Sequence, residues 1–227
     1  MNVFDYSSKN NRNINMATYT DNYIINVIKD TSSIYFNGEI NNFSMEKLTN
    51  ELLKMELSIK QTIKKVSKIV DDAKEKIKEI TDENENDITL NLTNNMHIKL
   101  YITTYGGCVH NAFSIIDIIK CMEIPIHTIC KGCVASAGTL ISLSGKKRFI
   151  TKHSYMLMHE LRTSCWGKFS YIKDEFINAE DLMECIKTYY VNNSKITMEE
   201  IEQQLKQDKM WDATTCLTHG LVDEILS

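Results

Sequence analysis

Three short segments of the chain combine residue types that could together catalyse acyl transfer. A glycine pair, Gly106-Gly107, follows an alternating apolar segment. Ser136 stands among small residues, with Ala135 before it and Ala137 after it. His159 ends a short apolar run. Acyl transfer needs a nucleophile, a base that takes its proton, a carboxylate that orients the base, and donors for the oxyanion. The three segments supply candidates for most of these parts.

Each segment also has an ordinary structural interpretation when it is taken alone. A glycine pair can simply form a tight turn between a strand and a helix. Ser136 could be the N-cap of a helix that begins after it. A single histidine such as His159 at the end of an apolar strand is more often a structural residue with satisfied hydrogen bonds. The combination of all three, each at the end of an expected strand, is what favours catalysis.

The pattern of apolar residues predicts strands and helices that alternate along the chain. Strands are expected at 33–40, 97–103, 125–130, 148–151, 155–158 and 221–225, and helices from Ser44 onward and at 109–121, 136–143, 169–191 and 198–205. This order predicts an α/β fold of right-handed βαβ units on a largely parallel sheet. Loops at the carboxyl ends of such strands carry the chemistry. The three candidate segments lie in those loops.

The helix that starts near Ser44 is predicted to run further than a compact domain needs. Apolar residues recur three and four positions apart, at Ile63, Val66, Val70, Ala73, Ile77 and Ile80. We call this row the heptad seam. It is too short for an independently stable coiled coil, so we expect it to pack against another helix or a neighbouring subunit. The alternative is an amphipathic surface helix whose charged positions face solvent. A polar loop, 83–87, is expected to end it.

Composition limits the classes of function. At 227 residues the chain is expected to form one domain, 31–227, after a polar and partly ordered amino-terminal arm, 1–30. A net charge of -4 provides no basic surface for nucleic acid. Neither a signal peptide nor a membrane span is expected. The seven cysteines are odd in number and scattered, which fits reduced thiols and a cytoplasmic location. The pair Cys130 and Cys133 could bind zinc or act in redox chemistry, but small packing residues are the favoured interpretation, and no metal or cofactor is expected.

Four segments together resemble the signature segments of the Clp protease proteolytic subunit. They are 101–107, 132–138, 156–159 and 201–223. They occur in the family's order and with matching separations, and the resemblance covers roughly 33–58 and 97–226. It implies the ClpP/crotonase-like fold, with a long protruding handle helix at 169–191. The heptad-patterned helix then belongs to an inserted segment at about 59–96.

The resemblance also implies roles for individual residues. Ser136 corresponds to the nucleophile, His159 to the general base and Asp208 to the acid that orients the base. The backbone N–H groups of Gly107 and Ala137 correspond to the oxyanion donors. The chain order Ser, His, Asp differs from the orders of the α/β-hydrolases, chymotrypsin and subtilisin.

Two other acids compete with Asp208 for the orienting role, and local patterns separate them. Asp212 precedes the segment 213–219, which Gly220 follows, and is therefore predicted to be the N-cap of a short helix. Asp223 lies in the last expected strand and is predicted to be structural.

The family further implies an ATP-dependent endopeptidase that cuts unfolded polypeptides inside a chamber. That chamber would be a homo-oligomer of seven-membered rings stacked in pairs, with the handle helix at the ring-to-ring contact and an AAA+ unfoldase as a possible partner. The chain departs from the family at Tyr105, where proline is usual, and at Glu160-Leu161, where Gln-Pro is usual. Two alternatives stay open: a catalytically weak scaffold subunit, and a crotonase-like acyl-CoA enzyme.

Overall fold

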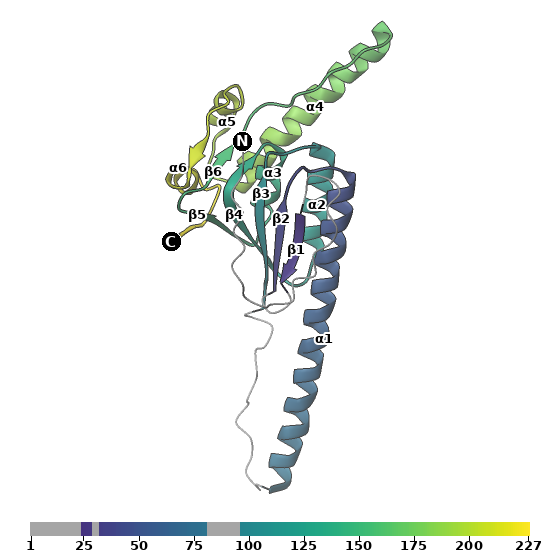
Figure 1. Ribbon diagram of the computed structural model, residues 1–227, viewed down its shortest axis with the longest axis vertical. Helices are drawn as coiled ribbons and strands as arrows, with labels where there is room; N and C mark the ends of the chain where they lie inside the picture. The colour runs from purple at the N-terminus through teal and green to yellow at the C-terminus, as the bar shows by residue number, and fades with distance from the viewer. Residues whose placement is uncertain (1–23, 29–31, 81–95) are drawn as a thin grey trace, which may run out of the picture.

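The computed structural model describes residues 24–28, 32–80 and 96–227 (Figure 1). Within them the strands are β1 (Ile24–Ile28), β2 (Ser33–Asn37), β3 (Ile98–Thr104), β4 (Ile126–Ala135), β5 (Lys147–Thr151), β6 (Tyr155–Leu157), β7 (Trp211–Asp212) and β8 (Glu224–Leu226). The helices are α1 (Asn42–Ile80), α2 (Val109–Cys121), α3 (Ala137–Leu143), α4 (Phe169–Asn193), α5 (Met198–Leu205) and α6 (Ala213–Thr218). Strands and helices alternate, as the apolar pattern predicts. No helix in these ranges has the length and apolarity that crossing a membrane requires.

The sheet is largely parallel, which confirms the predicted fold class. Its order is β1-β2-β3-β4-β5-β8, and β6 and β7 join it beside β4. All pairs are parallel except β1 with β2 and β6 with β7. Parallel pairing places the carboxyl ends of neighbouring strands at one edge. The ends of β3, β4 and β6, which precede the candidate segments, therefore meet.

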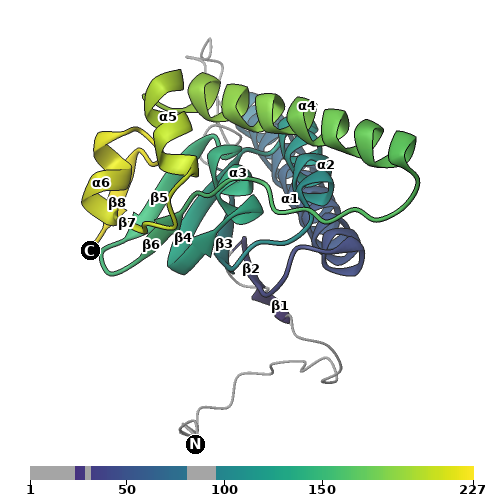
Figure 2. The same cartoon turned by 90° about the horizontal axis from the view of Figure 1, so that it is seen from above.

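The core lies between the sheet and the helices packed on one of its faces (Figure 2). Alternate residues of β3, namely Ile98, Leu100 and Ile102, are fully buried there and contact the same cluster as Ile115 of α2. The opposite face carries polar and aromatic side chains such as Tyr101, which stacks on Tyr35. This period-two alternation explains why β3 could be recognised in the sequence.

Helix α1 begins in contact with the domain and then leaves it. Asn41 caps its first turn: the Asn41 carboxamide oxygen accepts from the Ser44 N–H at 2.9 Å, and the Ser44 hydroxyl accepts from the Asn41 N–H at 2.9 Å. The helix therefore starts at Asn42 and not at Ser44, which supplies the third helical position. Further along, the Glu56 carboxylate accepts from the N–H groups of Glu123 and Ile124. Beyond this anchor the helix extends away from the sheet (Figure 1).

Helix α4 also projects, at the other end of the domain (Figure 1). Its buried residues are Ile186 and Tyr190, both near its carboxyl end. The Tyr190 hydroxyl is hydrogen-bonded to the Thr139 hydroxyl of α3, and burial raises the pKa of Tyr190, so this phenol stays neutral. The predicted long helix at 169–191 is thus confirmed and fixed to the domain by its last turns.

The predicted bounds agree with the structure for most elements. Helices 109–121 and 198–205 end where expected, whereas the strand predicted at 125–130 continues to Ala135 and the one at 221–225 is shifted to 224–226. The two-residue strand β7 was not predicted. Of the expected arm, 1–30, the structure describes the strand β1, and the rest lies outside the described residues, as does the predicted loop at 83–87. The heptad seam lies on α1, and its packing partner stays a prediction.

Candidate active site

Strand β4 changes partner halfway along, and this change brings Ser136 close to His159. Residues 127–130 of β4 pair with β5, and residues 133–135 pair with β6. Between them an irregularity around Gly132, at φ +71°, shifts the register against β3. Ser136 follows β4, and its N–H donates to the Leu157 carbonyl at 2.7 Å. His159 lies two residues beyond that carbonyl.

Ser136 has an unusual backbone conformation. Its φ is 54° and its ψ is -129°, and it is the only non-glycine residue with a positive φ in the described part of the chain. Its side chain makes no capping hydrogen bond to α3, although it stands at the N-cap position. The N-cap interpretation therefore does not explain the serine. A strained residue at the start of a buried helix is typical of functional sites.

The glycine pair lies against Ser136, and a side chain at either position would collide with its neighbours. A Cβ atom on Gly106, at φ +104°, would lie 2.5 Å from the Ser136 Cβ. A Cβ on Gly107 would lie 2.2 Å from the Ile40 carbonyl oxygen. Ile40 forms a parallel bridge with Gly107. The Ile40 N–H donates to the Gly106 carbonyl, and the Ile40 carbonyl accepts from the Cys108 N–H. In a parallel bridge, the residue whose two neighbours make the hydrogen bonds, here Gly107, directs its own N–H away from its partner. The Gly107 N–H therefore points away from Ile40.

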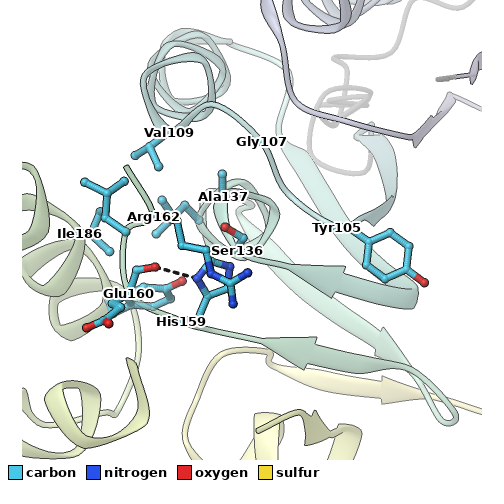
Figure 3. Close-up of a pocket in the computed structure, with 12 residues that line it drawn as sticks. Tyr105, Gly107, Val109, Ser136, Ala137, His159, Glu160, Arg162 and Ile186 are labelled. Carbon is cyan, nitrogen blue, oxygen red and sulfur yellow. Dashed lines mark hydrogen bonds between the residues drawn. The ribbon is translucent and has the colours of Figure 1, made fainter. Parts of the chain in front are cut away.

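A cavity of about 270 Å³ opens above these residues (Figure 3). It is lined by Tyr105, Gly107, Val109, Ser136, Ala137, Leu140, His159, Glu160, Leu161, Arg162, Ile186 and Tyr190. The predicted nucleophile, base and oxyanion donors thus share one cavity. Helices α2, α3 and α4 contribute the apolar side chains Val109, Ala137, Leu140 and Ile186 to its wall, and the connection between β6 and α4 contributes the segment 159–162.

The His159 ring is oriented by a backbone carbonyl. Its Nδ1 lies 2.7 Å from the Glu160 carbonyl oxygen (Figure 3, dashed line). A carbonyl only accepts hydrogen bonds, so Nδ1 must carry the proton. In the neutral ring Nε2 is then the acceptor, which is the tautomer that a general base needs. Among the hydrogen bonds of the described residues, none joins the Ser136 hydroxyl to this ring.

The segment that contains Asp208 lies beside the segment that contains His159, but the Asp208 carboxylate is bound to Arg162. Strand β7 pairs antiparallel with β6, with Tyr155 opposite Asp212. The Glu160 N–H also donates to the Leu205 carbonyl at 2.8 Å, so the segments that carry His159 and Asp208 lie side by side. The two Asp208 oxygens, however, accept from Arg162 at 3.1 and 3.2 Å. The structure therefore brings Ser136, His159, Gly107 and Ala137 together, and it does not join Asp208 to His159.

The predicted structural roles of the other two acids are confirmed, but Asp223 lies before the last strand and not in it. The Asp212 carboxylate accepts from the Thr215 N–H at 2.7 Å and caps α6, and these hydrogen bonds to Thr215 lower the pKa of Asp212. Asp223 forms an ion pair with Arg148 and also accepts from the Arg148 N–H. It stands just before β8. Neither acid lies on the cavity.

Arg162 was not predicted to take part in this site. The only signal in the sequence was that Arg162 lies three residues after His159, in the connection that follows it. The Glu160 carbonyl could not have been foreseen either, because every residue carries a carbonyl and only the fold selects one.

The structure weighs against reactive chemistry at Cys130. This residue is fully buried, and burial raises its pKa to about 12. A thiol with such a pKa is not a thiolate at neutral pH, and thiolates are what bind metals or attack disulfides. The packing interpretation of Cys130 and Cys133 is therefore favoured.

Comparisons with known proteins show which sequences this chain is similar to. The sequence model of the family "Clp protease" matches residues 76–227, which is most of the chain. The ATP-dependent Clp protease proteolytic subunit of Lactococcus lactis subsp. lactis (strain IL1403) is 31% identical over 138 residues, 59% of this chain and 69% of that protein. The ATP-dependent Clp protease proteolytic subunit 2 of Treponema pallidum (strain Nichols) is 28% identical over 131 residues, 57% of this chain and 66% of that protein. These names give no support to the scaffold or crotonase-like alternatives. The chain belongs to the Clp protease family.

Proposed function

We propose that the chain is a Clp-type serine endopeptidase subunit that hydrolyses peptide bonds through an acyl-enzyme. The observation that carries this proposal is the strained Ser136, which lies against the glycine pair and shares a cavity with His159. A serine in this setting is exposed to a substrate carbonyl, has a base beside it and has backbone donors around it.

In the proposed reaction His159 Nε2 takes the proton of the Ser136 hydroxyl as its oxygen attacks the peptide carbonyl. The N–H groups of Gly107 and Ala137 stabilise the oxyanion of the tetrahedral intermediate. The histidine then gives its proton to the leaving amine, and water hydrolyses the ester by the same route.

Asp208 is proposed to complete the triad by exchanging partners. The Glu160 carbonyl already holds the His159 ring in the useful tautomer. A carboxylate in its place would also stabilise the positive charge that the ring acquires during attack, which a neutral carbonyl does less well. The exchange requires Asp208 to leave Arg162. The apo geometry of a catalytic site is commonly looser than that of its substrate complex.

The cavity suggests which peptides are cleaved. Val109, Leu140 and Ile186 line it, so it accepts an aliphatic or aromatic side chain next to the scissile bond. Such side chains are buried in folded proteins and exposed in unfolded ones. We therefore propose unfolded polypeptides as the substrate.

Assembly into a ring-shaped homo-oligomer is part of the proposal. The free end of α4 and the connection before it expose Trp166, Phe169 and Phe176, at 94, 84 and 63% of their possible area. Contiguous exposed apolar groups are typical of interaction sites. The relatives are named ATP-dependent Clp protease proteolytic subunits, which supports an ATPase partner. The proposed site of action is the cytoplasm.

Labelling with a fluorophosphonate probe tests the proposed nucleophile. We expect one adduct, mapped to Ser136 by peptide mass spectrometry, that is absent in Ser136→Ala and reduced in His159→Ala. Ser144→Ala is the matched control, because Ser144 is a buried serine at the other end of α3. A folded, oligomeric sample that reacts nowhere, or reacts equally in Ser136→Ala, would refute the proposal.

A further inference from the structure

Arg162 is the one strong cation among the residues that line the catalytic cavity. The other charged member of that lining is Glu160. In Figure 3 the Arg162 side chain points toward Ser136 and His159, whereas the Glu160 side chain points away from them. A substrate bound at Ser136 therefore meets the guanidinium of Arg162 at the cavity mouth. The apolar wall and this cation together define the chemistry of the binding site.

The ion pair that now occupies Arg162 is easily exchanged. A single terminal nitrogen of the guanidinium contacts both Asp208 oxygens, at 3.1 and 3.2 Å. Parallel pairing of two nitrogens with two oxygens, the strongest arrangement, is not used. The side chains are also 72 and 65% exposed. Exposed pairs of this kind contribute little to stability, so another carboxylate can replace Asp208 on Arg162.

We infer that Arg162 is a specificity-determining residue that selects peptides with an aspartate or glutamate beside the scissile bond. The inference rests on the proposed function. The substrate carboxylate binds the Arg162 guanidinium, and Asp208 leaves it. Because the segment of Asp208 lies beside that of His159, the released carboxylate can approach His159 Nδ1. An acidic substrate thus binds more tightly and also completes the triad.

A peptide series with one variable position separates this effect from ordinary binding. Each peptide carries a leucine before the scissile bond, and one flanking position at a time is Asp, Glu, Asn or Gln. Asp and Asn, like Glu and Gln, have nearly the same shape and differ in charge. We expect kcat/KM to be about tenfold higher for the acid than for the matched amide at one flanking position, the size of one hydrogen bond to a charged group. Part of the gain should appear in kcat.

Substitutions at Arg162 then show whether this side chain is responsible. Arg162→Gln should abolish the preference for acids and raise kcat for the neutral peptides, because Asp208 is no longer held. Arg162→Glu should invert the preference, so that an additional peptide with lysine at the same position is cleaved faster than the acidic peptides. Lys168→Gln removes a cation from the same connection without touching the cavity, and it should keep the wild-type preference.

The outcomes distinguish failure of the inference from failure of the proposed function. Equal cleavage of acid and amide peptides by an enzyme that a fluorophosphonate labels at Ser136 would refute the role of Arg162 and leave the peptidase intact. The same holds if the acid preference survives in Arg162→Gln. Absence of both labelling and cleavage would overturn the two together.

Discussion

At the scale of single residues, Ser136 is held in a conformation that an unfolded chain rarely adopts. A non-glycine residue in such a sparsely populated region costs about 1 to 3 kcal/mol. The Ser136 N–H bond to Leu157 and the fully buried helix α3 behind it maintain the conformation. The hydroxyl is thereby presented to the cavity before any substrate arrives, which lowers the entropic cost of attack.

Gly106→Ala should disable this arrangement. The new methyl group would lie 2.5 Å from the Ser136 Cβ, and alanine is strained at φ +104°. We expect a loss of at least about tenfold in fluorophosphonate labelling, since small displacements of reacting groups are costly. Gly132→Ala is the control: its φ is +71°, but its nearest contact is an ordinary 3.8 Å. Equal labelling of the two variants would show that the close approach to Ser136 is unimportant.

His127 should make the stability of the domain depend on pH. Its ring stacks on His97 at 3.9 Å, and partial burial, with the nearby charges of His97, Lys147 and Lys99, lowers its pKa from 6.5 to about 4. Between these values the unfolded chain binds a proton at His127 that the folded chain does not bind. Stability contributed by the neutral ring is therefore present above pH 6.5 and is lost as the pH falls toward 4.

Urea unfolding as a function of pH measures this dependence. The free energy of unfolding should fall less steeply between pH 6.5 and 4 in His127→Gln than in the wild type. Identical slopes for the two proteins would contradict the assignment to His127.

At the scale of elements, α1 is attached to the domain by its first half. Leu48 and Leu52 are fully buried, and Glu56 binds two backbone N–H groups of the connection between α2 and β4. Ile63 is partly buried against the core, and the helix continues to Ile80. The attachment therefore depends mainly on residues in the first half of the helix.

Glu56→Ala should loosen this attachment and destabilise the domain by about 1 to 2 kcal/mol, because a hydrogen-bond acceptor shared by two donors is lost. Glu51→Ala is the matched control. Its carboxylate contacts the exposed Lys54 within the same helix, and such pairs contribute at most about 0.5 kcal/mol. Chemical denaturation measures both effects, and equal losses in the two variants would argue against the anchoring role of Glu56.

The elements could be predicted wherever their stabilisation is local or periodic. Helix α2 has a clear apolar face, and the capping box of Thr197 and Glu200 marks the start of α5. The predicted strand at β4 was too short because Lys131-Gly132 interrupts its apolar run. The last residues of β4 pair with β6, which the apolar run does not indicate. Strand β7 depends entirely on that partner. The same rule holds for the site. The expected strand ends indicated Ser136 and His159 as candidate residues. The ion pair of Arg162 and Asp208 could not be predicted in this way, because it joins residues far apart in sequence.

At the scale of the whole molecule, the exposed end of α4 should direct assembly. Phe176 lines a surface groove of about 260 Å³ with Leu161 and Met183, next to the catalytic cavity. Phe176→Glu places a charge in an apolar contact, so we expect it to lower the oligomer mass measured by sedimentation velocity. Leu57→Glu is the control on α1, because the exposed fraction of Leu57, 58%, is close to that of Phe176, 63%. Unchanged mass in Phe176→Glu would remove this surface from the assembly.

The attachment of α4 at one end has a mechanical consequence. Its buried residues Ile186 and Tyr190 act as a pivot near α3, and Phe169 at the far end lies roughly 25 Å away at 1.5 Å per residue. A rotation of about 5° at the pivot would move that far end by roughly 2 Å, by the same helix dimensions. The connection that carries Arg162 is joined to the moving end, whereas His159 is held beside the domain by the bond from the Glu160 N–H to the Leu205 carbonyl, and Ser136 stays with the pivot. We therefore expect whatever holds the far end to adjust the position of Arg162 over the cavity.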